Sequence, residues 1–349
     1  MLKLSRRAFA AAPVAALFAQ QAENPAAPAP LFRDPICDGA ADPVVIWNRQ
    51  EQNWWLLYTQ RRANVDAPGV AWVHGTDIGV ARSADGGRSW RYLGALPGLE
   101  FERGRNTFWA PEVLWYAGAY HMYASYVPGV PQDWSGSRRI VHYTSPDLWQ
   151  WTCRGPLPLS SDRVIDACVE KIAGWRWRMW YKDEANHSHT WAADSPDLFR
   201  WTVAGPVING AGHEGPNVFR WRGSWWMVTD HWDGLGVFRS ADAEQWTRQA
   251  ANILREPGTR PDDGVKGGHA DVLVQDDDAW IFYFTHPQRT PGAALPRPIP
   301  GVEPYATRRS SIQVARLELE AGEIRCRRDE PFPFRLRPGV DNWTRLAGG

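Results

Sequence analysis

The chain has 349 residues with 39 basic and 39 acidic side chains, so its formal net charge is zero. Because no basic excess can neutralise a phosphate backbone or an anionic lipid surface, we expect no nucleic-acid partner, and no membrane partner once the N-terminal signal is removed. The 22 tryptophans favour packed, twisted sheets and stacking on the apolar faces of sugars.

The N-terminus has the pattern of a targeting segment. Arg6 and Arg7 precede an apolar run at residues 10–19, which is too short to span a bilayer. This pattern resembles a bacterial twin-arginine export signal. The sequence therefore predicts a signal peptide over 1–22, a linker over 23–33, one folded domain over 34–349, and a periplasmic or secreted protein.

From residue 42 onward, one unit recurs five times: a short apolar strand, a polar turn and an aromatic-rich strand. The units open at Asp42, Ala110, Asp166, Gly215 and His269. Four units continue into a Ser-x-Asp turn followed by Trp, at residues 83–90, 145–151, 195–201 and 240–246. A repeat of about 50–70 residues suits a four-stranded blade. The sequence predicts an all-β protein, a five-bladed β-propeller with a single catalytic domain.

The first strand of each propeller blade lines the central channel, so the opening residues of the units should meet at one mouth. Asp42, Asp166, Glu214 and His269 are therefore expected to converge there, where desolvation and like charge separate pKa values as acid/base catalysis requires. The second strands end at the same mouth. Further side chains near it are predicted to bind substrate: Arg61, Trp109, Glu112, Lys182, Asp230, His231 and Trp232.

These motifs resemble glycoside hydrolase family 43. The resemblance rests on Asp42-Pro43, Trp109-Ala110-Pro111-Glu112-Val113, Ile165-Asp166 and Glu214-Gly215-Pro216, in that order. It implies an inverting glycosidase in which Asp42 is the general base and Glu214 the general acid. It also implies that Asp166 orients the acid and raises its pKa, and that His269 helps to hold a divalent cation, such as calcium, through water.

The sequence departs from that pattern at two places, and it leaves other functions open. Ala167 follows Asp166 where proline is usual, and His213 precedes Glu214. The His213-Glu214-Gly215 triplet is similar to family 117, exo-enzymes that release anhydrogalactose from agar fragments, and it makes His213 a second candidate acid.

Two further alternatives are a sialidase and a propeller that binds carbohydrate without catalysis. The segment 83–90 fits the Asp-box of sialidases, but no inner strand opens with the arginine that such an enzyme needs. A mere binding protein would not need three carboxylates at one mouth. The expected partner is carbohydrate, and the expected substrates are plant or algal oligo- and polysaccharides, such as α-L-arabinofuranosides or β-xylosides.

Overall fold

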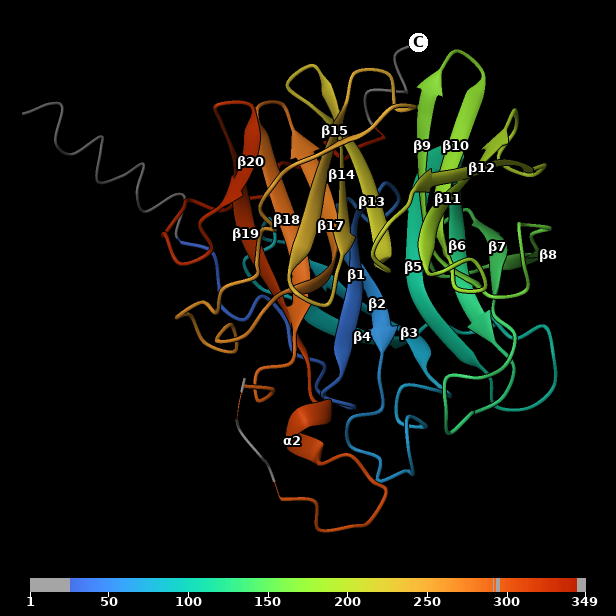
Figure 1. The fold of residues 1–349 in the computed structure, drawn as a ribbon, viewed down its shortest axis with the longest axis vertical. Coiled ribbons are helices and arrows are strands. Elements are labelled where there is room, and N and C mark those ends of the chain that lie inside the picture. The colour runs from blue at the N-terminus through green and yellow to red at the C-terminus, as the bar shows by residue number, and fades with distance from the viewer. Residues whose placement is uncertain (1–25, 291, 293–295, 344–349) are drawn as a thin grey trace, which may run out of the picture.

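The computed structural model describes residues 26–290, 292 and 296–343, and these form five four-stranded antiparallel sheets around a common axis (Figure 1). In each sheet the strand order follows the chain, so the first strand of every blade lies innermost. The predicted five-bladed β-propeller is confirmed.

The blades occupy consecutive stretches of the chain. Blade 1 consists of β1 (Ala40–Asn48), β2 (Asn53–Gln60), β3 (Asp77–Ser83) and β4 (Arg91–Ala95). Blade 2 consists of β5 (Thr107–Tyr116), β6 (Ala119–Val127), β7 (Arg139–Ser145) and β8 (Thr152–Pro156). Blade 3 consists of β9 (Val164–Ala173), β10 (Arg176–Asp183), β11 (His189–Ser195) and β12 (Thr202–Ile208). Blades 4 and 5 consist of β13 (Glu214–Trp221), β14 (Ser224–Asp230), β15 (Leu235–Ser240), β16 (Thr247–Arg248); and β17 (Gly268–Gln275), β18 (Asp278–Thr285), β19 (Ser311–Glu320), β20 (Glu323–Cys326).

The described residues contain one labelled α-helix, α2 (Tyr305–Arg308), in the long segment between β18 and β19. This segment projects at the bottom of Figure 1. Across the described part of the chain, no helix has the length and apolar character needed to cross a membrane. The predicted signal peptide at 1–22 lies outside the described residues.

The tryptophans pack the blades together. Six of them are almost completely buried: Trp54, Trp55, Trp177, Trp180, Trp221 and Trp226. The predicted Ser-x-Asp turns connect the third and fourth strands of their blades. In the first turn, Asp85 Oδ1 accepts hydrogen bonds from the N–H groups of Arg88 and Ser89, each at 3.0 Å. The Trp that follows the turn packs between sheets, as where Trp201 of blade 3 meets Tyr123 of blade 2 edge-on.

A β-bulge near the start of the inner strands sets which side chains face the mouth. The pairing register shifts between Ala41 and Val44 in β1, and equivalent shifts occur in the other four blades. The residue at the bulge has a left-handed backbone in four blades, with φ of 49° at Asp42, 42° at Ala110, 58° at Asp166 and 56° at Gly215. Since a bulge places two residues opposite one, two adjacent side chains can point to the same side.

Just below the mouth, side chains link neighbouring blades in a ring. The residue two positions after the bulge accepts the backbone N–H of the next blade in four cases: Glu112 from Val169, Cys168 from Val218, Asn217 from Val272 and Asp271 from Val45. We call Glu112, Cys168, Asn217 and Asp271 the inter-blade ring. It leaves a cavity of only about 20 Å³, room for one water molecule.

Both ends of the described chain close the propeller. Phe32 and Ile312 of β19 exchange two backbone hydrogen bonds of 3.1 and 2.9 Å, and Leu31 and Phe32 are buried. Within the predicted linker over 23–33, Leu31 and Phe32 are therefore part of the core. At the other end, Asp341 forms a buried ion pair with Arg49 of blade 1 at 2.8 Å.

Candidate active site

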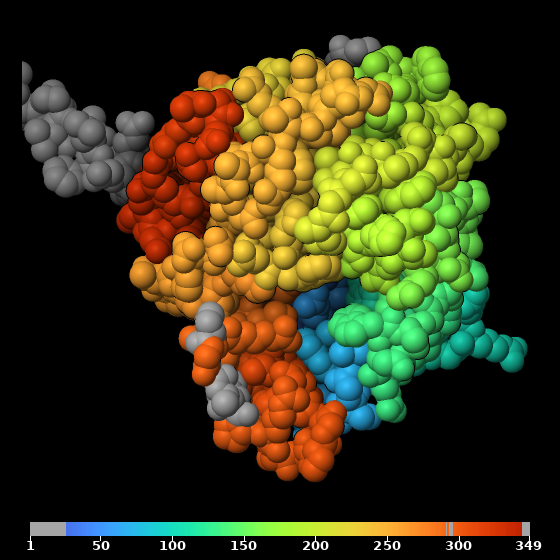
Figure 2. Space-filling view, in the orientation of Figure 1, coloured from blue at the N-terminus to red at the C-terminus, as the bar shows by residue number. Residues whose placement is uncertain are grey.

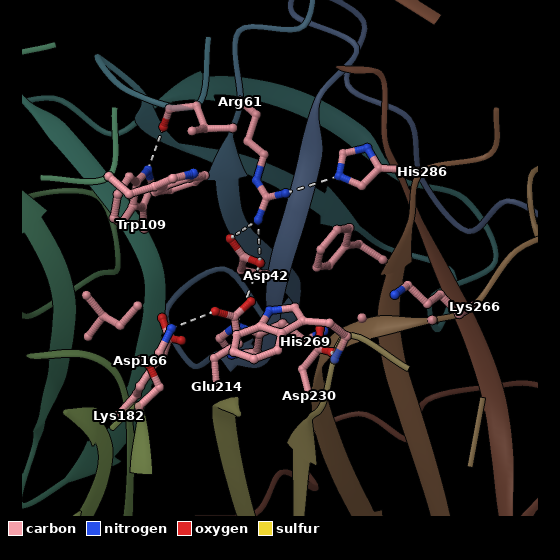
Figure 3. A pocket seen from close by; sticks show the side chains of 18 of the residues that line it. Asp42, Arg61, Trp109, Asp166, Lys182, Glu214, Asp230, Lys266, His269 and His286 are labelled. Atoms are coloured by element: carbon pink, nitrogen blue, oxygen red, sulfur yellow. Dashed lines mark hydrogen bonds and ion pairs between the residues drawn. The ribbon is translucent and has the colours of Figure 1, made fainter. Parts of the chain in front are cut away.

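A cavity of about 690 Å³ lies at the mouth of the channel, where the inner strands of all five blades contribute to its wall. Figure 2 shows the surface hollowed where blue, green and orange segments meet. In Figure 3, the side chains of Asp42, Asp166, Glu214 and His269 are grouped together in this cavity. The predicted convergence of three carboxyl groups and one imidazole is present in the structure.

Asp42 is held as an ionised carboxylate. Its side chain is buried, and Arg61 Nη2 donates to Asp42 Oδ1 and Oδ2 at 3.0 and 3.1 Å. His269 Nδ1 lies 3.6 Å from Asp42 Oδ1. Burial raises the pKa of Asp42, but the charges of Arg61 and His269 and the Thr59 hydroxyl outweigh it, so the pKa is lowered. An ionised carboxylate can accept a proton from water.

The pKa of Asp166, in contrast to that of Asp42, is raised. It is buried, with a pKa raised to about 7; burial is the main cause, and the charges of Glu214 and Asp42 add to it against His269 and Lys182. Its Oδ2 accepts the backbone N–H of Gly215 at 3.1 Å, next to Glu214. Asp166 is therefore still largely protonated just below neutral pH, and its hydrogen bond to Gly215 connects it to the start of the strand that carries Glu214.

Lys182 of β10 has the main influence on the protonation of Glu214. Lys182 Nζ donates to Glu214 Oε2 at 3.0 Å and also lies 3.3 Å from Glu184 Oε1. Burial raises the pKa of Glu214, but the Lys182 ammonium and hydrogen bonds from Lys182 and Trp232 lower it further than burial raises it. The expectation that Asp166 raises the pKa of Glu214 is not met in the substrate-free site, because Lys182 is in direct contact and dominates.

Asp230 is a further buried carboxyl in the cavity, and it accepts hydrogen bonds from two neighbouring residues. Its Oδ1 accepts the N–H of Trp232 at 2.7 Å, and its Oδ2 accepts the N–H of His269 at 2.9 Å. Burial and then the charge of Glu214 raise the pKa of Asp230 to about 6. Burial lowers the pKa of His269, but four surrounding carboxyls, Asp166 first, raise it overall.

The structure brings most of the predicted substrate-binding residues to the cavity. Its wall includes Arg61, Trp109, Lys182, Asp230 and Trp232. Trp109 is fixed by a hydrogen bond of 2.6 Å from its Nε1 to the carbonyl of Val73. Trp232 is 46% exposed, which leaves a ring face open for a ligand.

Three predicted site residues do not line the cavity. His213 is completely buried, with Nε2 2.7 Å from Thr190 Oγ1 and Nδ1 3.0 Å from the Ala211 carbonyl, so it cannot reach a substrate as an acid. Glu112 belongs to the inter-blade ring and binds a backbone N–H instead of a ligand.

His231 is the third of these residues. Asp230 closes a turn onto Trp232, whose φ of 56° brings its own ring to the cavity. The His231 ring turns away, so that its Nε2 lies 2.9 Å from Thr229 Oγ1 and the ring stacks on His213.

Sequence reasoning did not name several residues of the cavity wall, which come from loops after the second strands and from the loops before β9 and β17. They are Trp72, Trp134, Arg163, Glu184, Lys266 and Arg289. Because second strands end at the mouth, the tryptophans in the loops 61–76 and 128–138 could have been assigned to it. The fold of those loops, however, is not encoded in the strand repeat.

The cavity does not suit direct coordination of the calcium ion that the resemblance implies. Among the described residues, no group of three or more His, Cys, Asp or Glu side chains is placed to hold a metal ion. Moreover, the surrounding carboxyls raise the pKa of His269, which favours the protonated imidazole, and that form has no lone pair to offer a metal. We therefore derive no chemical step through a metal.

No family model and no curated protein matches the chain. Solved structures do match. A thermostable family-43 glycoside hydrolase is 20% identical, with a TM-score of 0.60 over 88% of this chain and 99% of its own. The GH43_1 enzyme from Xanthomonas citri complexed with xylotriose is 15% identical, with a TM-score of 0.61 over 89% and 96%.

A third similar structure is a GH43 β-xylosidase/α-arabinofuranosidase from a compost microbial metagenome in complex with xylotriose. It is 14% identical, with a TM-score of 0.59 over 84% of this chain and 95% of its own. These similarities show that the chain has the five-bladed fold of family 43 glycoside hydrolases.

Proposed function

We propose that the protein is a glycoside hydrolase that inverts the anomeric centre by a single displacement. The observation that carries this proposal is the opposite electrostatic treatment of neighbouring carboxyls in one cavity. Arg61 and His269 keep Asp42 ionised, whereas burial keeps a proton on Asp166 beside Glu214. Pairs of carboxyls whose pKa values are driven apart are the basis of acid/base catalysis on glycosides.

In the proposed reaction, Asp42 takes a proton from a water molecule as that water attacks the anomeric carbon. Glu214 gives a proton to the leaving oxygen as the glycosidic bond breaks. Glu214 must be protonated for this step, although Lys182 favours its ionised form. We propose that sugar hydroxyls take over Lys182 Nζ when substrate binds, so that Glu214 can accept the proton held at Asp166.

The open faces of Trp232 and Trp134 support a carbohydrate substrate, because they are 46% and 55% exposed at the cavity wall. Two of the similar structures contain xylotriose. We propose plant or algal oligosaccharides as the substrate class, with β-xylosides and α-L-arabinofuranosides the first to test. The twin-arginine-like segment supports a protein exported to meet such polymers.

The test compares hydrolysis of aryl glycosides and of plant and algal polysaccharides by the parent protein, Asp42→Asn and Glu214→Gln. We expect each variant to lose about 10²–10⁴-fold in kcat/KM, the usual contribution of a general acid or base. NMR of the first product formed should show the inverted anomer. Asp278→Asn, at a surface hairpin, is the matched control and should keep parental activity. Sugar binding by the parent without turnover would refute the proposal.

A further inference from the structure

Two cations in the cavity wall are left without an acidic partner. Lys266 and Arg289 both line the cavity, and neither has a carboxylate oxygen within 4.0 Å among the described residues. The other cavity cations are paired: Arg61 with Asp42, Lys182 with Glu214, and Arg163 with Glu184.

Glu303 is the acidic residue whose charge acts on Arg289, but its carboxylate is bound to other groups. Glu303 Oε2 is 2.9 Å from Arg297 Nη2, and Glu303 Oε1 accepts the Thr307 hydroxyl at 2.7 Å. Arg289 and Lys266 are both exposed to solvent at the cavity wall. Partial desolvation and then the charge of Arg61 lower the pKa of Arg289 to about 10, and the charge of Glu303 offsets only part of this. The positive charge of Arg289 is therefore repelled by the guanidinium of Arg61.

The geometry holds Arg289 ready for a ligand. Its Nε donates to the carbonyl of Thr307 at 2.7 Å, and its guanidinium carbon lies 5.7 Å from the centre of the Trp72 ring. These contacts engage Nε and the guanidinium carbon, and the two Nη groups form no hydrogen bond with a described residue. A guanidinium fork of this kind matches a carboxylate or a sulfate.

Blade 5 and its loops supply two of the cations of the cavity wall. Lys266, Arg289 and His286 all come from this part of the chain. His286 Nδ1 donates to the Arg309 carbonyl at 2.9 Å, and its Nε2 faces Arg61 Nη1 at 3.3 Å. The carboxyls of Asp166, Glu184 and Asp230 line the same cavity. A negatively charged substituent would be attracted to Lys266 and Arg289 and repelled from these carboxyls.

We propose that the substrate is an acidic sugar chain, with a carboxylate or sulfate group bound by Arg289 and Lys266. This inference rests on the proposed glycosidase function and narrows its substrate class. The charged group would orient the sugar, because Lys266 and Arg289 attract it and the carboxyls of the cavity repel it. A neutral xylan or arabinan oligosaccharide would leave both cations without a partner.

The test uses matched oligosaccharides that differ only in charge. One arm compares uronic-acid oligosaccharides with their methyl esters, and the other compares sulfated algal oligosaccharides with desulfated ones. We expect the charged member of one pair to have a kcat/KM at least tenfold higher, the scale of a charge-assisted hydrogen bond. The kcat/KM of the charged member should fall as ionic strength rises, whereas that of the neutral member should not change. The arm that responds identifies carboxylate or sulfate.

Arg289→Gln and Lys266→Gln should each reduce the preference for the charged member about tenfold, as a ratio of kcat/KM values. The Lys266 side chain forms no hydrogen bond with a described residue, so its variant tests the proposal even if Arg289→Gln folds poorly. The control Arg316→Gln, on β19, should leave the ratio unchanged. Equal or better use of the neutral members, with no change in either variant, would overturn the inference while leaving the glycosidase function intact.

Calorimetry with the same oligosaccharides separates the two proposals. Tighter binding of the charged member without any hydrolysis would refute the glycosidase function and support the acidic ligand. Equal binding of both members would refute the acidic ligand regardless of turnover.

Discussion

At the scale of single residues, the candidate site depends on which group lies beside each carboxyl. Asp42 and Glu214 each contact a cation, Arg61 or Lys182, and both have lowered pKa values. Asp166 forms no ion pair with any described residue, and its pKa is raised to about 7. The chemistry of three similar acids is therefore set by their neighbours, as the physics of buried charges requires.

The Lys182–Glu214 contact predicts a shift in the pH profile. Lys182→Met removes the ammonium that lowers the pKa of Glu214, so the pKa of Glu214 should rise. A general acid works only while it is protonated, so the alkaline limb of kcat/KM should move to higher pH even if the rate falls. Arg163→Met is the control, because Arg163 lines the cavity but contacts Glu184 instead. An unmoved limb in Lys182→Met would argue against Glu214 as the acid.

The raised pKa of Asp166 predicts a pH-dependent gain in stability for Asp166→Asn. Between the ordinary pKa of 3.8 and about 7, the folded state holds a proton that the unfolded state has lost. Stability from this group is full below pH 4 and is lost as pH rises through 7. The variant should equal the parent near pH 4 and exceed it by about 1–3 kcal/mol at pH 8. Parallel urea-unfolding results at both pH values would contradict the assignment.

At the scale of elements, the bulge in each inner strand is the device that builds the site. It lets Asp42 and Asp166 face the mouth from the bulge position, and Glu214 from the position before it. The left-handed backbone at Asp42 and Asp166 is strained for residues other than glycine, and such strain is typical of functional sites. In blade 4 the bulge residue is Gly215, which brings its backbone against His269.

Gly215→Ala should therefore damage both stability and activity. A Cβ at residue 215 would lie 2.7 Å from His269 Cγ, in a backbone with φ of 56°. We expect a loss of about 2–4 kcal/mol in the free energy of unfolding, together with a fall in turnover as His269 moves. Gly223→Ala is the matched control: φ is 80°, but nothing lies within 4 Å. It should cost about 1 kcal/mol and no activity; equal losses in both variants would show that His269 is not displaced.

The repeat in the sequence predicted the blades and the placement of Asp42, Asp166 and Glu214, because strand periodicity and turn residues are local signals. The repeat does not determine which way the residue before Glu214 faces, and the family 117 resemblance pointed to His213 as an acid, whereas the structure buries His213 against Thr190. Glu112 was also expected at the mouth. Its hydrogen bond from the Val169 N–H of the next blade depends on tertiary packing, which the repeat does not show. Trp134 and Arg289 were missed because their loops have no repeating pattern.

At the scale of the whole molecule, the propeller is closed by segments far apart in the chain. Residues 31–39 run beside β19, and Asp341 holds Arg49 of blade 1. In the described structure, each blade is built from one continuous stretch, so these contacts join the first and last blades. Closure thus depends on side chains and short bridges more than on a shared sheet.

Asp341→Asn tests this closure. The Asp341 carboxylate is 1% exposed and binds Arg49 Nη1 and Nη2 at 2.9 and 2.8 Å, so its loss leaves a half-buried guanidinium poorly paired. We expect a loss of about 1–3 kcal/mol in the free energy of unfolding. Asp276→Asn breaks an exposed pair with Arg337 and should leave the melting temperature unchanged. If the two variants melt alike, the Arg49 contact does not secure the ring.

The inter-blade ring has one more consequence. It fills the channel beneath the carboxyls, leaving space for a single water molecule, and Trp343 lies against that space from below. A sugar chain therefore cannot be threaded through the propeller, and whatever enters the mouth must back out of it. If the protein cleaves glycosides, each cut must be followed by disengagement, so a polymer would be shortened by repeated visits rather than by continuous sliding.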